Sequence, residues 1–329
     1  MVATLDIAAL ARQLASRSLG AEANIQAHIQ SLLLYGGLNL GEGDLVTVEL
    51  EAQVGGGRRI DIEAGLTAIE VKRDLRRGGV RAEAEKQLAG YVVDRTRLLG
   101  QRYTGILTDG VEWRLYHLVD EALEEVSRFE VAPANPDAEG LLVWLEGALA
   151  TVQAIAPTPR EIERRLGARS SAHALASADL TSLYEKHRDD PTVELKRRLW
   201  ARLLRTAFGT GFADDDQLFI DHTSLVISAE IIAHAVVGID PLLLAPASVL
   251  GGQRFAQAGI SGVIEEDFFD WVIEVPGGDE LIRGLARRLT RFAWQDVEHD
   301  VMKVLYESII NAEQRHRLGE YYTPDGWLT

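Results

Sequence analysis

Apolar and polar residues alternate along residues 58–63 and again along 67–73, with the two-residue period of a half-buried β-strand. The dipeptide Gly65-Leu66 separates the runs and predicts a type II′ turn, which places glycine first. The two runs therefore predict a β-hairpin. Similar patterns predict further strands and, at a 3.6-residue period, helices. The other predicted strands cover 44–54, 103–109, 112–119 and, as a further candidate, 125–131, and the helices cover 1–18, 21–33, 80–99 and 136–153.

Beyond this region the pattern becomes helical. The segment Ala156-Pro157-Thr158-Pro159 predicts a short, stiff linker, because proline restricts its own backbone and disfavours helix before it. We expect an α/β domain at 1–155, with a mixed sheet flanked by helices, an all-α connector domain at 156–295, and the beginning of a third domain at 296–329. Helices are predicted at 160–166, 172–187, 192–208, 214–237, 264–274 and 278–294.

The predicted hairpin brings two carboxylates and an ammonium together. If Ala64 pairs with Thr67 across the turn, Asp61 lies opposite Glu70, and opposed Cβ atoms lie roughly 4.5–5.5 Å apart. Lys72 shares a face with Glu70, since side chains on a strand repeat every two residues. Two carboxylates this close need a cation or a shared proton, and Mg²⁺ is commonly held by one or two carboxylates. The alternative is an exposed hairpin whose glutamate and lysine form a surface ion pair worth little energy.

This arrangement resembles the core motif of the PD-(D/E)xK nuclease superfamily, an Asp followed by Glu-x-Lys on the next strand. Upstream, Glu22 lies near the start of a predicted amphipathic helix, where many members carry a glutamate that reaches the metal. Downstream, the Gln87 to Tyr91 segment is similar to the Gln-x-x-x-Tyr helix of the RecB-like and type I restriction branches. Residues 105–116 resemble the hairpin that closes this domain in type I restriction subunits. One departure is that residues 55–60 lack the proline that names the superfamily.

The resemblance implies a Mg²⁺- or Mn²⁺-dependent DNA endonuclease. It implies that Asp61 and Glu70 bind the metal, with the Val71 carbonyl as a third ligand. It implies further that Lys72 orients or activates water, that Glu22 assists at the metal, and that Gln87 holds Lys72 or the phosphate.

The last residues carry a second resemblance. A predicted helix at 300–310 leads into residues 315–324, which resemble the opening of the γ-class N6-adenine DNA methyltransferases. In that family the Gly-x-Tyr-Tyr-Thr-Pro segment packs against S-adenosylmethionine, which here implies Tyr322, Thr323 and Pro324. The glycine-rich loop and the Asn-Pro-Pro-Tyr motif of the family do not occur in these 329 residues, so we expect no methylation by this portion. The order of nuclease, connector and methyltransferase is that of type IIG-like restriction–modification enzymes.

Composition bounds the remaining possibilities. Without cysteine, there is neither a disulfide scaffold nor a thiolate metal site, and no run of 18 apolar residues predicts a membrane span. We therefore expect a cytoplasmic protein without a membrane partner. The net charge of −16 opposes DNA binding at first sight. However, residues 58–81 carry seven basic and four acidic residues, and further basic clusters lie at 194–205 and 283–291, which leaves double-stranded DNA as the expected partner.

Two alternatives stay open. The nuclease-like domain could be a catalytically silent DNA-binding module, or a nuclease that fires only with partners in a phage-defence system. The presence of Asp61, Glu70 and Lys72 together argues against the silent module. A single nuclease site would need a homodimer to cut both strands. In the helical half, Asp221-His222 suggests an acid–base pair, but no nucleophile accompanies it, and we expect a buried structural histidine.

Overall fold

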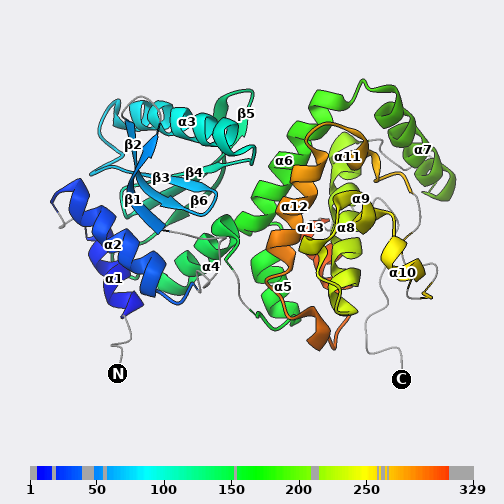
Figure 1. The fold of residues 1–329 in the computed structure, drawn as a ribbon. Coiled ribbons are helices and arrows are strands. Elements are labelled where there is room, and N and C mark those ends of the chain that lie inside the picture. Colours follow the sequence, from blue (N-terminus) through cyan, green and yellow to red (C-terminus); the bar gives the residue numbers. More distant parts are fainter. Residues whose placement is uncertain are drawn as a thin grey trace. The chain divides into compact units, whose positions relative to one another are not determined.

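The computed structural model describes residues 6–16, 20–38, 48–54, 58–151, 154–208, 215–257, 259–260, 264 and 267–310. The chain divides into two compact units. The first comprises Met1–Ala154 and Arg169–Ala178, and the second comprises Ile155–Ala168 and Asp179–Thr329. The first unit contains the β-sheet, and the second is helical (Figure 1).

The first unit is built on a six-stranded sheet whose strands follow one another in chain order. All neighbouring strands are antiparallel except β3 and β4, which are parallel and are joined by α3 (Val80–Leu99). A parallel connection needs such a crossover, because the chain must return to the same end of the sheet. The predicted mixed sheet with flanking helices is therefore confirmed. The strands are β1 (Val48–Val54), β2 (Arg58–Ala64), β3 (Thr67–Val71), β4 (Thr104–Thr108), β5 (Glu112–Val119) and β6 (Ala122–Glu130).

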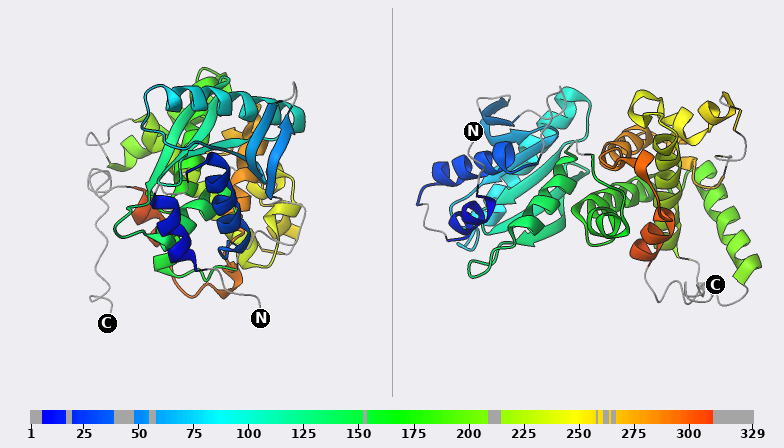
Figure 2. Two further views of the ribbon diagram at one scale, coloured as in Figure 1. Left: turned by 90° about the vertical axis from the view of Figure 1, so that its left-hand side faces the viewer. Right: turned by 90° about the horizontal axis from the view of Figure 1, so that it is seen from below.

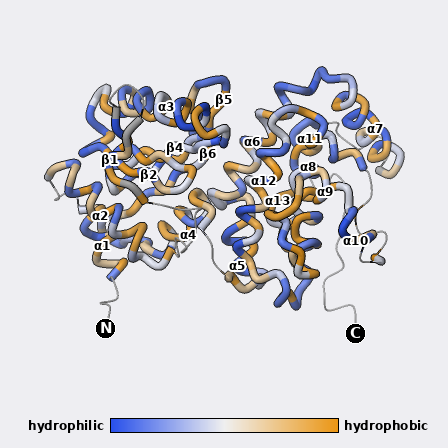
Figure 3. Tube along the Cα trace, in the orientation of Figure 1, coloured by the Kyte–Doolittle hydropathy of each residue, from blue (hydrophilic) through white to orange (hydrophobic). Residues whose placement is uncertain are grey.

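Helices cover both faces of this sheet. Helices α1 (Ile7–Ala15), α2 (Glu22–Tyr35) and α4 (Ala138–Leu149) lie on one face, and α3 lies on the other (Figures 1 and 2). Hydrophobic and hydrophilic residues alternate along these helices (Figure 3), and each helix buries a set of apolar residues. The result is a three-layer arrangement of helix, sheet and helix.

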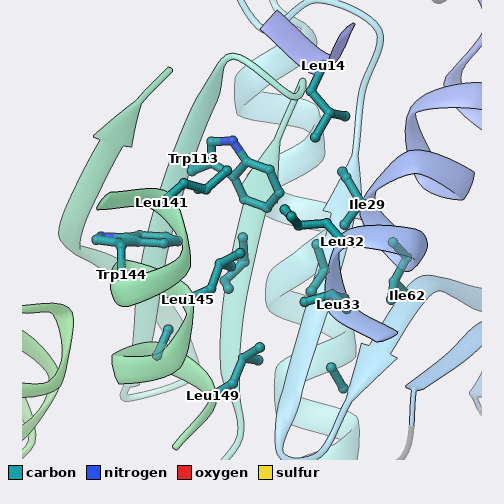
Figure 4. Packing of buried hydrophobic residues seen from close by; sticks show 14 of the residues in the cluster. Leu14, Ile29, Leu32, Leu33, Ile62, Trp113, Leu141, Trp144, Leu145 and Leu149 are labelled. Atoms are coloured by element: carbon teal, nitrogen blue, oxygen red, sulfur yellow. The ribbon is translucent and has the colours of Figure 1, made fainter. Parts of the chain in front are cut away.

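Each face of the sheet has its own hydrophobic core. The core on the face of α1, α2 and α4 contains Leu32 of α2, Leu145 of α4 and the Trp113 side chain of β5 (Figure 4). On the face of α3, Leu88 and Tyr91 pack against Leu107 of β4. Gly105 in β4 permits this close approach, because a Cβ there would lie 2.9 Å from the Leu88 side chain. The α3 core matters for function because Glu70 lies on this face, beside Leu107 in the sheet register.

The second unit contains the predicted helices with corrected limits. The predicted helix at 264–274 is shorter, with only α11 (Trp271–Glu274) in its described part, and the one at 278–294 ends at Leu289. The looser stretch before residue 258 contains short helices. The helices of this unit are α5 (Pro159–Leu166), the second half of α6 (Ser171–His187), α7 (Pro191–Phe208), α8 (Asp216–Val236), η3 (Pro241–Leu243), α9 (Pro246–Leu250), α10 (Gln253–Gln257), α11, α12 (Gly278–Leu289), η4 (Trp294–Asp296) and α13 (Val301–Ile309).

Helix α8 is the central helix of the second unit. Phe219 on it packs against the rings of Tyr184, Trp200 and Trp271. Within the described part of the chain, α8 alone is long and apolar enough to cross a membrane by length and composition, and 56% of that window is buried inside the protein. A core helix passes the same test, and the burial of Phe219 places α8 in a core.

Candidate active site

The β2–β3 hairpin has the register that its turn predicts. Ala64 pairs with Thr67 and Ile62 pairs with Ile69. The next residues away from the turn are Asp61 on β2 and Glu70 on β3. Gly65 has a φ of 57°, the left-handed value that the first position of a type II′ turn requires. Beyond the last of these pairs, the Val71 backbone N–H donates a hydrogen bond to Asp61 Oδ2 at 2.8 Å. The carboxylate of Asp61 is thereby held against the end of β3.

Glu70 is fully buried, and only part of its carboxylate has a partner. Lys72 Nζ donates a hydrogen bond to Glu70 Oε1 and forms an ion pair with it. The other oxygen, Oε2, is buried and has no hydrogen-bond partner in the described part of the chain. Burial, and then the charge of Asp61, raise the pKa of Glu70 to about 7 despite the nearby lysine. The site therefore contains an acceptor oxygen for which these residues provide no donor.

The other two charged groups respond to the same environment. Burial raises the pKa of Asp61 above its ordinary value, and the Val71 amide and the charge of Lys72 only partly oppose this effect. Burial opposes the charge on Lys72, but its hydrogen bond to Glu70 and the nearby carboxylates outweigh burial and raise the pKa of the ammonium. Lys72 thus stays a cation between two carboxylates whose ionised forms are disfavoured.

Glu22 reaches the same end of β3 from the first turn of α2. Its Oε1 accepts a hydrogen bond from the backbone N–H of Arg73 at 3.1 Å, one residue beyond Lys72. Its charge acts on Asp61, Glu70 and Lys72, although it bonds directly to none of them. Glu22 therefore joins the site, and its observed bond holds the backbone after the lysine.

Gln87 and Tyr91 lie on α3, which covers this face of the sheet. Gln87 Nε2 donates a hydrogen bond to the Tyr91 hydroxyl at 2.7 Å, across one helical turn. The predicted bond from Gln87 to Lys72 is not among the hydrogen bonds of the described residues; the amide pairs with Tyr91 instead. Burial raises the pKa of Tyr91, and the charges of Glu70 and Asp61 add to this effect, which places the ring within electrostatic reach of the carboxylates.

Asp109 supports the site but escaped the sequence prediction. It is buried at the end of β4 and accepts hydrogen bonds from the backbone N–H groups of Leu75, Val111 and Glu112. The neighbouring Thr108 carbonyl accepts the Lys72 N–H at 2.9 Å. The pair Asp109-Gly110 is a recognisable turn signal, but its bond to Leu75 spans 34 residues and depends on the parallel β3–β4 pairing.

In the described part of the chain, no group of three or more His, Cys, Asp or Glu side chains is arranged as a metal site. The hairpin site contains two such carboxylates, Asp61 and Glu70, and a strand-end carbonyl at Val71. Two carboxylates, with backbone and water oxygens, are a donor set that hard divalent cations use. The unbonded Glu70 Oε2 is consistent with this chemistry.

The predicted cofactor residues Tyr322, Thr323 and Pro324 lie outside the described residues. Trp113 and Tyr116 of the closing hairpin are buried in the two cores of the first unit. Comparisons with protein-family models, with curated protein sequences and with solved structures found no match to this chain.

Proposed function

We propose that the first unit is a Mg²⁺- or Mn²⁺-dependent DNA endonuclease domain of the PD-(D/E)xK type, in a restriction–modification enzyme. The observation that carries the proposal is the buried carboxylate of Glu70, which has one oxygen on Lys72 and the other without a donor among the described residues. The alternative of a surface ion pair requires an exposed hairpin, whereas Glu70 has no exposed surface. Burying an under-satisfied carboxylate costs stability, and such costs are typical of functional sites.

Asp61 and Glu70 would hold the cation, with the Val71 carbonyl as a third ligand. When bound, such a cation acidifies a coordinated water and stabilises the negative charge that grows on the phosphate under attack. The carboxylates of this site are acceptors that need a cation, so the residues fit the metal.

The remaining residues would position the reactants. The Lys72 ammonium, held by Glu70, would orient the attacking water or neutralise a phosphate oxygen. Glu22 would keep the backbone after Lys72 in place through the Arg73 N–H. Gln87, fixed by the Tyr91 hydroxyl, would offer its amide to the phosphate rather than to the lysine.

A plasmid-cleavage assay tests this function. Wild-type protein with Mg²⁺ or Mn²⁺ is expected to nick or linearise supercoiled DNA, and EDTA is expected to stop the reaction. Lys72→Ala is expected to lose at least about 100-fold in rate, the scale of one positioned acid–base or electrostatic group. The matched control is Lys186→Ala, which removes an exposed lysine on α6. Cleavage that survives Lys72→Ala would contradict the proposal, and DNA binding without any cleavage would favour the silent or partner-gated module.

The wider enzyme is a proposal from the sequence. The resemblance at 305–324 supports an adenine-specific methyltransferase in the same protein, with S-adenosylmethionine as its cofactor and target recognition in cis. Double-strand cleavage would need a homodimer. Sedimentation analysis with DNA, together with the ratio of nicked to linear product, tests whether two copies act at one site.

A further inference from the structure

A basic loop with a hydrogen-bonded backbone follows the lysine of the proposed nuclease site. This arginine loop, residues 73–79, connects β3 to α3 and contains the exposed residues Arg73, Arg76 and Arg77. Gly78 and Gly79 complete it, and a Cβ at either position would meet no atom within 4 Å. The outer surface of the loop therefore consists largely of guanidinium groups and open backbone.

Several hydrogen bonds hold the loop backbone in place. The Arg73 N–H donates to Glu22, and the Leu75 N–H donates to Asp109 Oδ2 at 3.1 Å. The Leu75 side chain is buried in the α3 core. Within the loop, Asp74 accepts the Arg76 N–H at 3.1 Å. Because these bonds fix the loop backbone, binding through the arginines needs little further ordering of the backbone.

The single acid of the loop, Asp74, only partly balances its charge. The Asp74 carboxylate lies 3.0 Å from Arg76 and 4.0 Å from Arg77, so one acid serves two guanidinium groups. The Arg73 side chain has no ion pair among the described residues. The arginine loop is thus net positive in a chain whose overall charge is −16.

The other basic clusters predicted from the sequence do not offer a comparable surface. On α12 and just after it, Arg291 is buried, and burial and the nearby Arg165 and Arg288 lower its pKa to about 9. On α7, Lys196 and Arg197 are bound to acids of their own unit. The exposed arginines of α7 alternate with three exposed leucines, Leu195, Leu199 and Leu203. These apolar side chains make the surface less suitable for binding phosphate groups.

The geometry points to the arginine loop as the surface that binds the DNA backbone next to the scissile phosphate. The inference rests on the proposed nuclease function and assigns the substrate contact to this loop. Arg77 lies five residues beyond Lys72, which spans at most about 17 Å of chain. At a rise of about 3.4 Å per nucleotide, this backbone length corresponds to about five nucleotides, so the contacted phosphates lie close to the cleaved bond.

The experiment measures DNA binding separately from cleavage. Fluorescence anisotropy with a short labelled duplex in EDTA gives the affinity of the full chain at about 50 to 200 mM salt. The triple variant Arg73→Gln, Arg76→Gln and Arg77→Gln is expected to bind at least about tenfold more weakly. Its slope of log affinity against log salt is expected to fall by up to about 2.7, because each phosphate contact contributes about 0.9. Lysine at the same three positions is expected to keep most of the binding.

The matched control carries the same charge change on α7: Arg198→Gln, Arg202→Gln and Arg205→Gln. It is expected to bind DNA with nearly wild-type affinity and salt slope. Equal affinity of the loop variant and the wild type, or a larger loss in the α7 variant, would overturn the inference. Absence of DNA binding by the wild type would overturn it as well. If the wild type binds DNA through the loop but does not cleave it, only the proposed nuclease activity is refuted. The failure of the proposed function is therefore distinguishable from the failure of this inference.

Discussion

The substitution Glu70→Gln should stabilise the metal-free protein at high pH. Glu70 is fully buried beside Asp61, and its pKa rises from 4.5 to about 7. Because the folded pKa lies above the unfolded one, the unfolded chain ionises first as pH rises. The stability contribution is therefore intact below about pH 4.5 and is lost as pH rises through about 7. The interval between these two values corresponds to about 3 kcal/mol.

Glutamine has the same shape and cannot ionise, so it removes this loss. Without divalent cations, the variant should exceed the wild type in free energy of unfolding by up to about 3 kcal/mol near pH 9. Near pH 5 the difference should be small. Urea denaturation followed by circular dichroism, in EDTA, measures both values. Adding Mg²⁺ should then stabilise the wild type more than the variant, since a ligand stabilises the state that binds it.

Glu63→Gln is the matched control on the same hairpin. Glu63 is also buried, but Arg95 lies 2.5 Å from its carboxylate and the Tyr103 hydroxyl donates to it at 2.8 Å. Its replacement leaves the arginine without its acid and should destabilise the protein by about 1–3 kcal/mol. If wild type and Glu70→Gln keep the same stability difference from pH 5 to pH 9, the reasoning about Glu70 is refuted.

Three further predictions concern stability. Leu32→Ala leaves a cavity in the core that contains Trp113 and should lower the free energy of unfolding by about 2–5 kcal/mol, measured by urea denaturation. The control Leu34→Ala removes an exposed side chain of the same helix and should lower it by less than about 0.5 kcal/mol. Equal effects of the two variants would contradict this core assignment. Burial and two nearby acids raise the pKa of Glu230 to about 8, so stability should fall between about pH 4.5 and 8, and Glu230→Gln should flatten that fall. Burial lowers the pKa of His222 to about 4, so stability should fall as pH drops from 6.5 toward 4; a His222→Gln variant with the same acid loss would rule this out.

Local patterns in the sequence were sufficient to predict the hairpin and its register. The alternation around Gly65-Leu66 and the glycine at a left-handed position determine which residues pair, because a turn of fixed length allows one register. Asp61, Glu70 and Lys72 follow from that register. The helix at Val80–Leu99 was predicted with its observed limits, because glycines flank a long helical pattern.

The neighbours of the hairpin were decided by the tertiary structure. Glu22 reaches Arg73 across 51 residues, and Asp109 reaches Leu75 across 34. Neither a hydrophobic period nor a turn motif predicts contacts between residues so far apart in the sequence, because these contacts form only when helices and strands pack on a shared sheet. The same packing directs Gln87 to Tyr91 instead of to Lys72.

The sequence shows which positions are charged, but it does not show whether a charged side chain is buried or exposed. The sequence places a basic cluster at 283–291 and another at 58–81 without distinguishing their environments. In the folded protein Arg291 is enclosed while Arg76 and Arg77 face solvent. Likewise, the pKa of Glu70 is raised mainly because burial excludes water from its carboxylate, and the charge of Asp61 adds to this effect. The sequence by itself determined which groups meet in the hairpin, and only the tertiary structure decided which of them lose water, because desolvation depends on everything that packs around a charge.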